Sequence, residues 1–318
     1  MQKTFLLVLI TFTIHHSLFT NEASAQTIAD TSWKHGGYFS VNISQTQYTN
    51  WAGGGENSMA LNGMLNVFKN YKVEKTTWDN ALDLNYGMVK LSNAHLRKSD
   101  DKMELNSKYG KLAKGKFFYS GMLNFKSQFT RGYNYPDDTN AISEFLSPAT
   151  IVIALGMDYK PNDFFSLFIS PATGKFTYVN SVKIADAGLY GNEPAHFDSV
   201  SKTLVHGKKS RAEFGASLSS KFQKNIFKNV NLLAKLNLFN NYTDKVVENR
   251  GNIDVNFEAL LTMKVNKFLA ASVYANAIYD DDIAIPLYTD VNGIKMQTGT
   301  GKRMQLKDVI GVGLAYKF

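Results

Sequence analysis

The chain has 318 residues, a formal net charge of +8 and no cysteine, which excludes a fold held together by disulfides. The basic charge alone would permit a nucleic-acid partner, but the sequence has no Arg-rich cluster and begins with an export signal, so we expect none. Hydrophobic residues make up 44% of the chain although the mean hydropathy is −0.22, which is typical of alternating apolar and polar residues.

The first 25 residues have the parts of a secretory signal peptide. Lys3 gives a positive start, an apolar run covers residues 5–14, and Ala23-Ser24-Ala25 forms a small-residue cleavage site. We therefore predict a signal peptide at residues 1–25 and a single mature domain at residues 26–318. No apolar run of helix length follows, so we expect any membrane span to consist of strands.

Period-two alternation of apolar and polar residues continues along the mature chain and predicts twelve strands. The clearest is 253–265, where Phe257 and Leu261 share the apolar face. The seventh is the weakest, because Pro171 interrupts it. The predicted strands are Gly37–Ser44, Ala60–Phe68, Thr77–Val89, Asp101–Tyr109, Phe117–Gln128, Ile151–Tyr159, Phe164–Ser170 with a possible extension to Tyr178, Ala212–Phe222, Val230–Leu238, Ile253–Val265, Leu269–Tyr279 and Leu306–Phe318.

The connections between these strands alternate in length. The short ones are Lys69–Thr76, Lys111–Lys116, Lys160–Asp163, Lys221–Asn229 and Asn266–Lys267, and all six prolines are expected in connections or at a strand end. Outer-membrane barrels have an even number of antiparallel strands, short periplasmic turns and longer extracellular loops. We therefore predict an all-β, antiparallel, up-and-down transmembrane β-barrel of about 12 strands, with both termini periplasmic. A soluble sandwich gives no reason for this alternation in length.

The short turns are rich in Lys and lack Arg, which suits contact with anionic phospholipid headgroups. Aromatic residues gather at the same strand ends and predict an aromatic girdle. They are Phe68, Tyr71, Trp78, Tyr109, Phe117, Tyr159, Phe164, Phe222, Phe268, Tyr316 and Phe318.

The last strand carries an apolar face that ends on the terminal residue. Ile310, Val312 and Leu314 lead on this face to Tyr316 and Phe318. This segment resembles the closing strand of bacterial outer-membrane barrels, in which a terminal aromatic residue is commonly read by the assembly machinery. The resemblance implies that Tyr316 and Phe318 are assembly signals, with outer-membrane lipid and the barrel-assembly machinery as partners.

The opposite, inward faces of the strands carry charges of both signs. Such charges either line a water-filled pore or form ion pairs that plug the lumen, and the pattern does not separate the two. The near balance of signs argues against strong ion selectivity. The candidate lumen-lining residues are Asp79, Asp83, Lys102, Glu104, Lys126, Asp158, Arg211, Glu213, Lys235, Asp254 and Glu258.

Other motifs are explained better by structure than by chemistry. Gly53-Gly54-Gly55 lacks the Lys-Ser/Thr of a phosphate loop, and we interpret it as part of a packed surface loop. Asp280-Asp281-Asp282 with Asp290, and Asp137-Asp138, offer oxygen ligands for a divalent cation, but without fixed spacing we favour solvated loop charge. No metal or other cofactor is expected.

Several stretches are similar to a family of outer-membrane β-barrel proteins of unknown function from Bacteroidota. The similarity covers essentially the whole mature chain and implies the fold and the compartment, the cell outer membrane. It implies no catalytic or binding residues. The stretches are Asn50 to Ser58, Trp78-Asp79-Asn80, Leu82-Asp83-Leu84, Tyr86-Gly87, Asp101-Lys102, Lys108-Tyr109-Gly110, Gly156 to Pro161 and Ser170 to Lys175.

The leading functional hypothesis is passive passage or import of an unidentified small solute through the lumen. The alternative is a non-conducting barrel whose long extracellular loops bind a partner or surface ligand. An outer-membrane hydrolase is a distant third, because a His two residues before a Ser is absent from the mature sequence, and we expect no enzyme. A channel predicts a continuous polar path, whereas a binding barrel predicts an occluded lumen and ordered loops.

Overall fold

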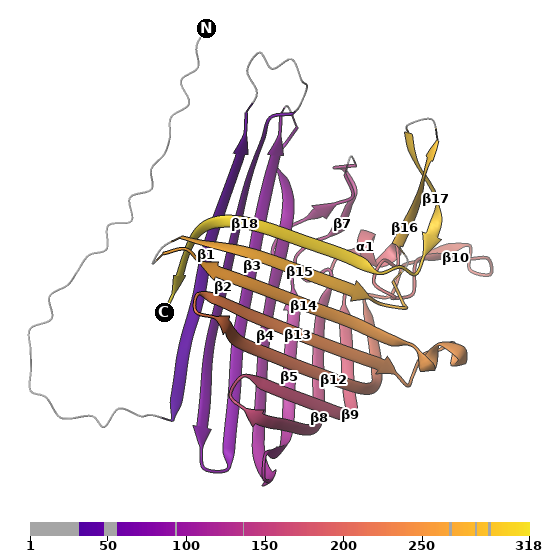
Figure 1. Ribbon diagram of the computed structural model, residues 1–318. Helices are drawn as coiled ribbons and strands as arrows, with labels where there is room; N and C mark the ends of the chain where they lie inside the picture. The colour runs from indigo at the N-terminus through magenta and orange to yellow at the C-terminus, as the bar shows by residue number, and fades with distance from the viewer. Residues whose placement is uncertain are drawn as a thin grey trace, which may run out of the picture. The chain divides into compact units, whose positions relative to one another are not determined.

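The computed structural model describes residues 32–47, 56–92, 94–135, 137–266, 269–283, 285–291 and 294–318, so the predicted signal peptide and Gly53-Gly54-Gly55 lie outside it. Twelve strands of the described chain close into an antiparallel barrel (Figure 1). They are β1 (Trp33–Thr46), β2 (Ser58–Val73), β3 (Thr76–Leu91), β4 (Arg97–Lys114), β5 (Phe117–Ser127), β8 (Ala149–Asn162), β9 (Phe165–Tyr178), β12 (Ser210–Phe227), β13 (Val230–Asn241), β14 (Ile253–Lys264), β15 (Leu269–Tyr279) and β18 (Gln305–Lys317).

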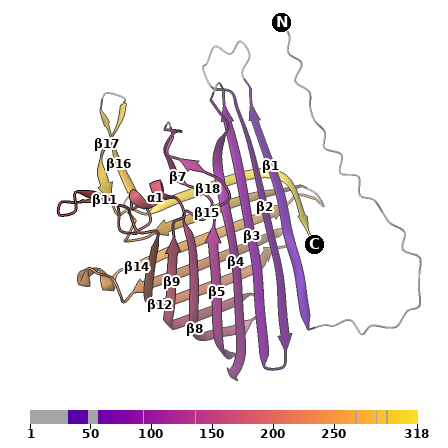
Figure 2. The same ribbon diagram turned by 180° about the vertical axis from the view of Figure 1, so that it is seen from behind.

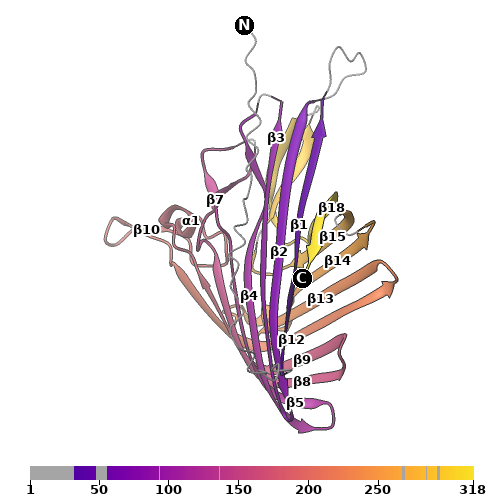
Figure 3. The same cartoon turned by 90° about the vertical axis from the view of Figure 1, so that its left-hand side faces the viewer.

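The strand order is up-and-down, as predicted. Each barrel strand pairs with the barrel strand before it in the chain, and β18 pairs with β1 to close the ring. Figure 3 looks toward this closing seam, with the C-terminus beside β1. All twelve predicted strands are present, and the seventh continues to Tyr178.

The short connections are tighter than the sequence suggests. β2 continues to Val73, so only Glu74 and Lys75 join it to β3, and Glu74 has a φ of 43° that such a tight turn uses. Gly115 has a φ of 61° in the equally short turn between β4 and β5. Several residues assigned to turns from the sequence are in the strands: Lys69 and Lys72 belong to β2, Thr76 begins β3, and Lys111 and Lys114 belong to β4.

Pro171 lies inside β9 and not at a strand end, which corrects the prediction. The pairing of β8 with β9 shifts register between Leu155 and Met157, so an extra residue of β9 bulges at Ser170 and Pro171. A bulge tolerates proline because the extra residue leaves the ladder. Gly156 faces this bulge, and a Cβ there would collide with the carbonyl oxygen of Ile169.

The long connections carry ordered small elements, which Figure 2 shows together at one end. Pro286 lies in one of them, within the long connection between β15 and β18, as predicted. In the described part of the chain, no helix is long and apolar enough to cross a membrane. The elements are β6 (Gly132–Tyr133), β7 (Ala141–Ser143), α1 (Val182–Asp186), β10 (His196–Asp198), β11 (Thr203–Val205), η1 (Val247–Gly251), β16 (Ile285–Val291) and β17 (Ile294–Gly301).

The barrel wall separates apolar from polar residues. Outward positions expose large apolar side chains such as Ile153, Phe176 and Leu314, while inward positions bury polar ones. Aromatic rings cluster at the short-turn end, where Trp33 lies 5.0 Å from Tyr71 and 6.0 Å from Trp78, ring centroid to centroid. Most of the predicted girdle lies there, but Phe68 shares the inward face with Asn66, and Phe268 is outside the described residues.

Candidate functional site: the lumen of the barrel

Two ion pairs cross the middle of the lumen. Lys102 Nζ of β4 lies 2.8 Å from Glu258 Oε1 of β14, and Lys235 Nζ of β13 lies 2.8 Å from Asp83 Oδ2 of β3. Around the ring of twelve, β14 is fourth and β4 tenth, while β13 is fifth and β3 eleventh. Each pair therefore joins strands six places apart, which are opposite walls of the barrel.

Neighbouring polar groups hold these pairs in position. Lys102 Nζ also lies 2.7 Å from Glu104 Oε2, and Asn124 donates to the other oxygen of Glu104 at 2.8 Å. Asn66 donates to Asp83 at 2.5 Å. A cavity lined by these side chains has a volume of about 40 Å³. That is room for a few water molecules at most.

A second layer fills the lumen toward the short-turn end. Lys108 Nζ lies 2.7 Å from Asp158 Oδ2, and Lys160 Nζ lies 2.6 Å from Asp79 Oδ2 and 3.4 Å from Asp158 Oδ2. Asp158 and the neighbouring Phe168 are both 0% exposed. Side chains along a water-filled channel keep contact with solvent, so this layer is packed as a protein core is packed.

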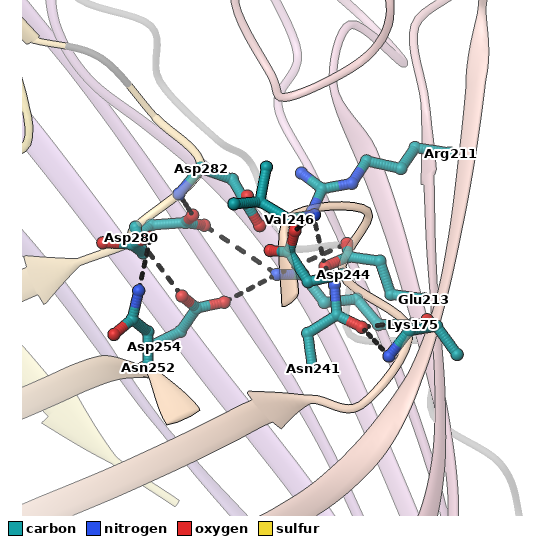
Figure 4. A network of polar contacts seen from close by, with 12 residues as sticks. Lys175, Arg211, Glu213, Asn241, Asp244, Val246, Asn252, Asp254, Asp280 and Asp282 are labelled. Atoms are coloured by element: carbon teal, nitrogen blue, oxygen red, sulfur yellow. Dashed lines mark hydrogen bonds and ion pairs between the residues drawn. The ribbon is translucent and has the colours of Figure 1, made fainter. Parts of the chain in front are cut away.

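A third network lies at the long-loop end (Figure 4). Lys175 Nζ is 3.0 Å from Asp254 Oδ2, 3.6 Å from Glu213 Oε2 and 3.8 Å from Asp280 Oδ2. Arg211 pairs with Glu213 at 2.9 Å and also with Asp282. The network therefore ties the loop after β15 to the inner faces of three strands.

The pKa values of two adjacent carboxylates in this loop, Asp280 and Asp281, shift in opposite directions. Burial raises the pKa of Asp280, despite the nearby Lys175 ammonium. Burial also acts to raise the pKa of Asp281, but hydrogen bonds from Lys302, Asn252 and Tyr279 outweigh it and the pKa is lowered. The two adjacent carboxylates thus differ because only Asp281 gathers several donors.

The expectation of solvated loop charge is wrong for Asp280, Asp281 and Asp282, which form ion pairs, whereas Asp137 and Asp138 are exposed. Asp254, Asp280 and Asp282 each place an oxygen within 4.8 Å of the others, a spacing that a cation could use. Two protein cations, Lys175 and Arg211, already contact these carboxylates. Asp137 accepts hydrogen bonds from the backbone of Thr139 and Asn140 and closes a turn. The side chain of Asp290 lies outside the described residues.

The structure places the predicted lumen residues in these three layers. Lys126 has no ion pair within 4.0 Å among the described residues, but it lies near the charges of Lys102, Glu104 and Glu258. The others meet partners, several of which the sequence reading missed. The members with ion pairs are Asp79, Asp83, Lys102, Glu104, Asp158, Arg211, Glu213, Lys235, Asp254 and Glu258.

The lumen residues that the sequence did not predict differ in the sequence features that could have revealed them. Lys108 and Lys160 follow the same alternation as Glu104 and Asp158, but Lys160 was assigned to a short turn instead of to β8. Lys175 follows the bulge at Pro171, where the alternation changes phase. No sequence signal places the loop residues Asp280 and Asp282 against the lumen.

The aromatic end of β18 lies on the outer face at the short-turn end. The rings of Tyr316 and Phe318 stack with centroids 6.1 Å apart. Phe318 exchanges two backbone hydrogen bonds with Gly37, at 2.9 and 3.1 Å. Its ring covers Gly37, where any side chain would collide with it. The last residue therefore closes the seam between β18 and β1.

Residues 43–133, from the end of β1 to β6, match the protein family described as "Protein of unknown function (DUF3078)". No curated protein sequence matches the chain. The matched stretch holds three of the mid-lumen residues, Asp83, Lys102 and Glu104.

Among solved structures, the chain is similar to three membrane barrels. An outer membrane channel from Pseudomonas putida F1 is 11% identical with a TM-score of 0.37, covering 89% of this chain and 95% of that one. The translocator domain of the autotransporter NalP from Neisseria meningitidis is 10% identical, with a TM-score of 0.35 and coverages of 92% and 90%. The NanC porin is 8% identical, with a TM-score of 0.35 and coverages of 88% and 98%. None of them is close enough to lend this chain its activity.

Proposed function

We propose that this protein is an integral barrel of the bacterial outer membrane that does not conduct in its resting state, and that its loop-bearing end binds a surface ligand or partner. Exposed apolar side chains on the outward strand faces support the membrane placement, since a soluble barrel would pay a large solvation cost for them. Aromatic pairs such as Phe117 with Tyr159, 4.7 Å apart, suit the interface at the short-turn end.

The orientation follows from the connections. The short turns face the periplasm, as in other outer-membrane barrels, and the ordered loops face the outside. The first residues of β1 and the end of β18 then both lie on the periplasmic side, because both are at the short-turn end. The barrel-assembly machinery would meet the terminal aromatic pair, Tyr316 and Phe318, from that side.

The closed lumen is the observation that carries the proposal. The pairs Lys102–Glu258 and Lys235–Asp83 cross it, and the layer of Asp158 and Phe168 beneath is packed. A solute would have to separate both pairs and repack this layer to pass. The described parts of the long loops, in contrast, form α1 and small hairpins that would present a surface to the outside.

Conductance in a planar bilayer tests the proposal. The wild-type protein should insert without unitary current steps, whereas the variant Lys102→Ala/Asp83→Ala/Glu258→Ala/Lys235→Ala, which removes both pairs, should show them. Folding and insertion are checked separately, by a difference in gel migration between unboiled and boiled samples and by flotation with liposomes. Stable unitary currents from the wild-type protein at low voltage would overturn the proposal.

A gated channel is the second candidate, because the lumen is closed by polar groups and not by an apolar plug. Asn106, Asn124, Asn256 and Asn276 hydrogen-bond to one another in pairs within the wall. Separated ion pairs would leave a hydrated path lined by such groups. Reversible current steps that appear only at high voltage, with wild-type stability otherwise, would favour this candidate.

A further inference from the structure

The seam between β1 and β18 is much shorter than the other junctions of these strands. Five residue pairs join β1 to β18, from Tyr38–Lys317 to Asn42–Gly313. By comparison, fourteen pairs join β1 to β2 and ten join β15 to β18. The seam is therefore closed only in its periplasmic half, next to Phe318.

Both strands continue beyond the last pair without pairing to each other. β1 extends to Thr46 and β18 begins at Gln305. The register of the seam would place Ile43 opposite Val312 and Ser44 opposite Gly311, yet neither pair forms. Figure 1 shows the two strands diverging from the C-terminal end, with β1 running up and β18 running to the right.

Glycine explains where the strands part. A Cβ at Gly313 would collide with the carbonyl oxygen of Val41, so the backbones approach here more closely than side chains allow. A Cβ at Gly311 would meet the side chain of Asn42 at 2.9 Å. β18 thus crosses β1 closely at Gly313, and from Gly311 back to Gln305 it pairs with β15 alone.

Exposure of the outward side chains agrees with an open edge. Leu306 and Ile310, at the far end of the unpaired part of β18, are each 76% exposed. Val312, next to the last pair, is 57% exposed, and Leu314 and Phe318 in the paired part are 64% and 53% exposed. Backbone groups without a partner are costly in hydrocarbon. An open edge at membrane depth is therefore tolerated where it borders a polar, hydrated space.

The inward side chains behind the gap keep partial contact with solvent, since Gln305, Lys307 and Val309 are each half-buried. Lys307 points inward from β18, pairs with Asp100 of β4 and lies 5.6 Å from the centre of the Tyr274 ring. Asp100 lies two residues from Lys102 toward the loop end of β4, so the Lys307–Asp100 pair is on the loop side of the mid-lumen pairs. One molecule lying across the gap would therefore meet charged groups inside and, outside, Leu306 and Ile310 with the exposed Asp308 between them.

We propose that the extracellular half of the β1–β18 seam is a lateral opening that admits an amphiphile of the outer leaflet, with its polar head in the upper lumen and its acyl chain in the bilayer. The inference rests on the membrane placement proposed above and names the chemical class of the ligand. An amphiphile fits because neither a fully polar solute nor a fully apolar one matches both sides of the gap. The closed mid-lumen then makes the upper compartment a binding cup and not a conduit.

Paired cysteines test the opening directly, because the native chain has none. Ser44→Cys/Gly311→Cys probes the open half, and Ser40→Cys/Ala315→Cys, an observed pair of the closed half, is the matched control. Disulfides need Cα atoms about 4.4–6.8 Å apart, so under a mild oxidant the control should cross-link at least tenfold faster. Equal rates would show that the seam is closed and would overturn the proposal.

A photoreactive lipid tests the ligand class. The protein is reconstituted in phosphatidylethanolamine and phosphatidylglycerol vesicles that contain phosphatidylethanolamine with a diazirine in its acyl chain, and labelled residues are identified by mass spectrometry. Labelling is expected at the outward Leu306 and also at the inward Val309 and Asn42, and inward labelling should fall at least fivefold after a bis-maleimide long enough to span the gap bridges the two cysteines of Ser44→Cys/Gly311→Cys. Labelling at Leu306 alone would refute the lateral opening but keep the membrane barrel. Labelling at none of these residues would instead refute the membrane placement.

Discussion

The inner and outer faces of β14 can be compared residue by residue, because they alternate along one strand. Phe257 on the outer face is 40% exposed, while its neighbour Glu258 on the inner face is 8% exposed and bonded to Lys102. In a soluble protein the apolar residue would be the buried one. The outer face of the strand therefore contacts no other part of the protein core, and the buried polar side chains of the inner face connect opposite walls of the barrel.

The difference teaches which interactions are replaceable. An outward apolar side chain meets whatever lipid is present, so a similar side chain serves equally well. An inward charge is paired with one specific group on the opposite wall, so its loss leaves that group without a counter-charge in a packed interior. Sensitivity to mutation should therefore follow the ion pairs inside and general hydrophobicity outside.

The largest effect is expected for Lys102→Met, which leaves Glu104 and Glu258 without their shared cation. Breaking a buried ion pair on one side costs roughly 3–5 kcal/mol. Urea unfolding of the purified barrel in detergent measures this loss. Lys302→Met is the control at the loop end, where the lysine side chain is 45% exposed, and should cost less than about 1 kcal/mol. Similar losses for both variants would contradict the contrast.

The outer face of the same strand should give the next effect. Leu261→Arg places a charge in the lipid and should cost on the order of 2–4 kcal/mol near mid-membrane. Leu261→Ile is the matched control and should be nearly neutral. Glu258→Arg on the inner face, in contrast, sets a second cation against Lys102 and should cost more than a change at an unpaired inward position. If Leu261→Arg and Leu261→Ile unfold at the same urea concentration, the register of β14 is wrong.

A smaller effect on stability is expected at the end of the outer face. Phe318→Ala removes a ring whose burial is worth roughly 1.5–3 kcal/mol, and part of that ring is exposed, so the lower figure applies. The amount of the Phe318→Ala variant in the outer membrane of cells should fall sharply, because the closing strand is recognised before the strands of the barrel have paired. Phe318→Tyr should restore that level. Parental levels of Phe318→Ala in cell fractions would rule out an assembly role.

The smallest effect belongs to the loops, where neither face of the wall is involved. Glu193 accepts hydrogen bonds from Lys208, at 2.7 Å, and from Lys245, which lower its pKa from 4.5 to about 2. A lowered carboxyl pKa means that the contact stabilises the fold above pH 4.5 and is lost as the pH falls toward 2. A carbon-detected NMR titration of the Glu193 carboxyl checks this. A midpoint near 4.5 would show that the contact is absent in solution.

Alternation along the strands is why most of the wall could be predicted from the sequence. A residue such as Leu155 faces lipid and Asp158 faces the lumen, so each strand records both environments in a period of two. The prediction fails where the period breaks. The bulge at Ser170 and Pro171 changes the phase of β9, so the inward position of Lys175 could not be read.

The partners inside the lumen could not be predicted for a different reason. Which residue meets Lys102 depends on the stagger of all the strands between β4 and β14, a property of the closed ring and not of either segment. The open half of the seam was hidden in the same way. Gly311 and Gly313 read only as small residues on an inward face, while the loss of pairing depends on how β18 crosses β1.

The two mid-lumen pairs also bear on how the protein folds and unfolds. Lys102 and Glu258 are 156 residues apart in the chain, and Lys235 and Asp83 are 152 apart. Such distant groups meet only after the sheet has rolled up, so their attraction contributes nothing to the early, local hairpins. Interactions that form after the rate-limiting step slow unfolding without speeding folding. The ion pairs across the lumen should therefore slow the unfolding of the finished barrel while leaving its rate of folding unchanged.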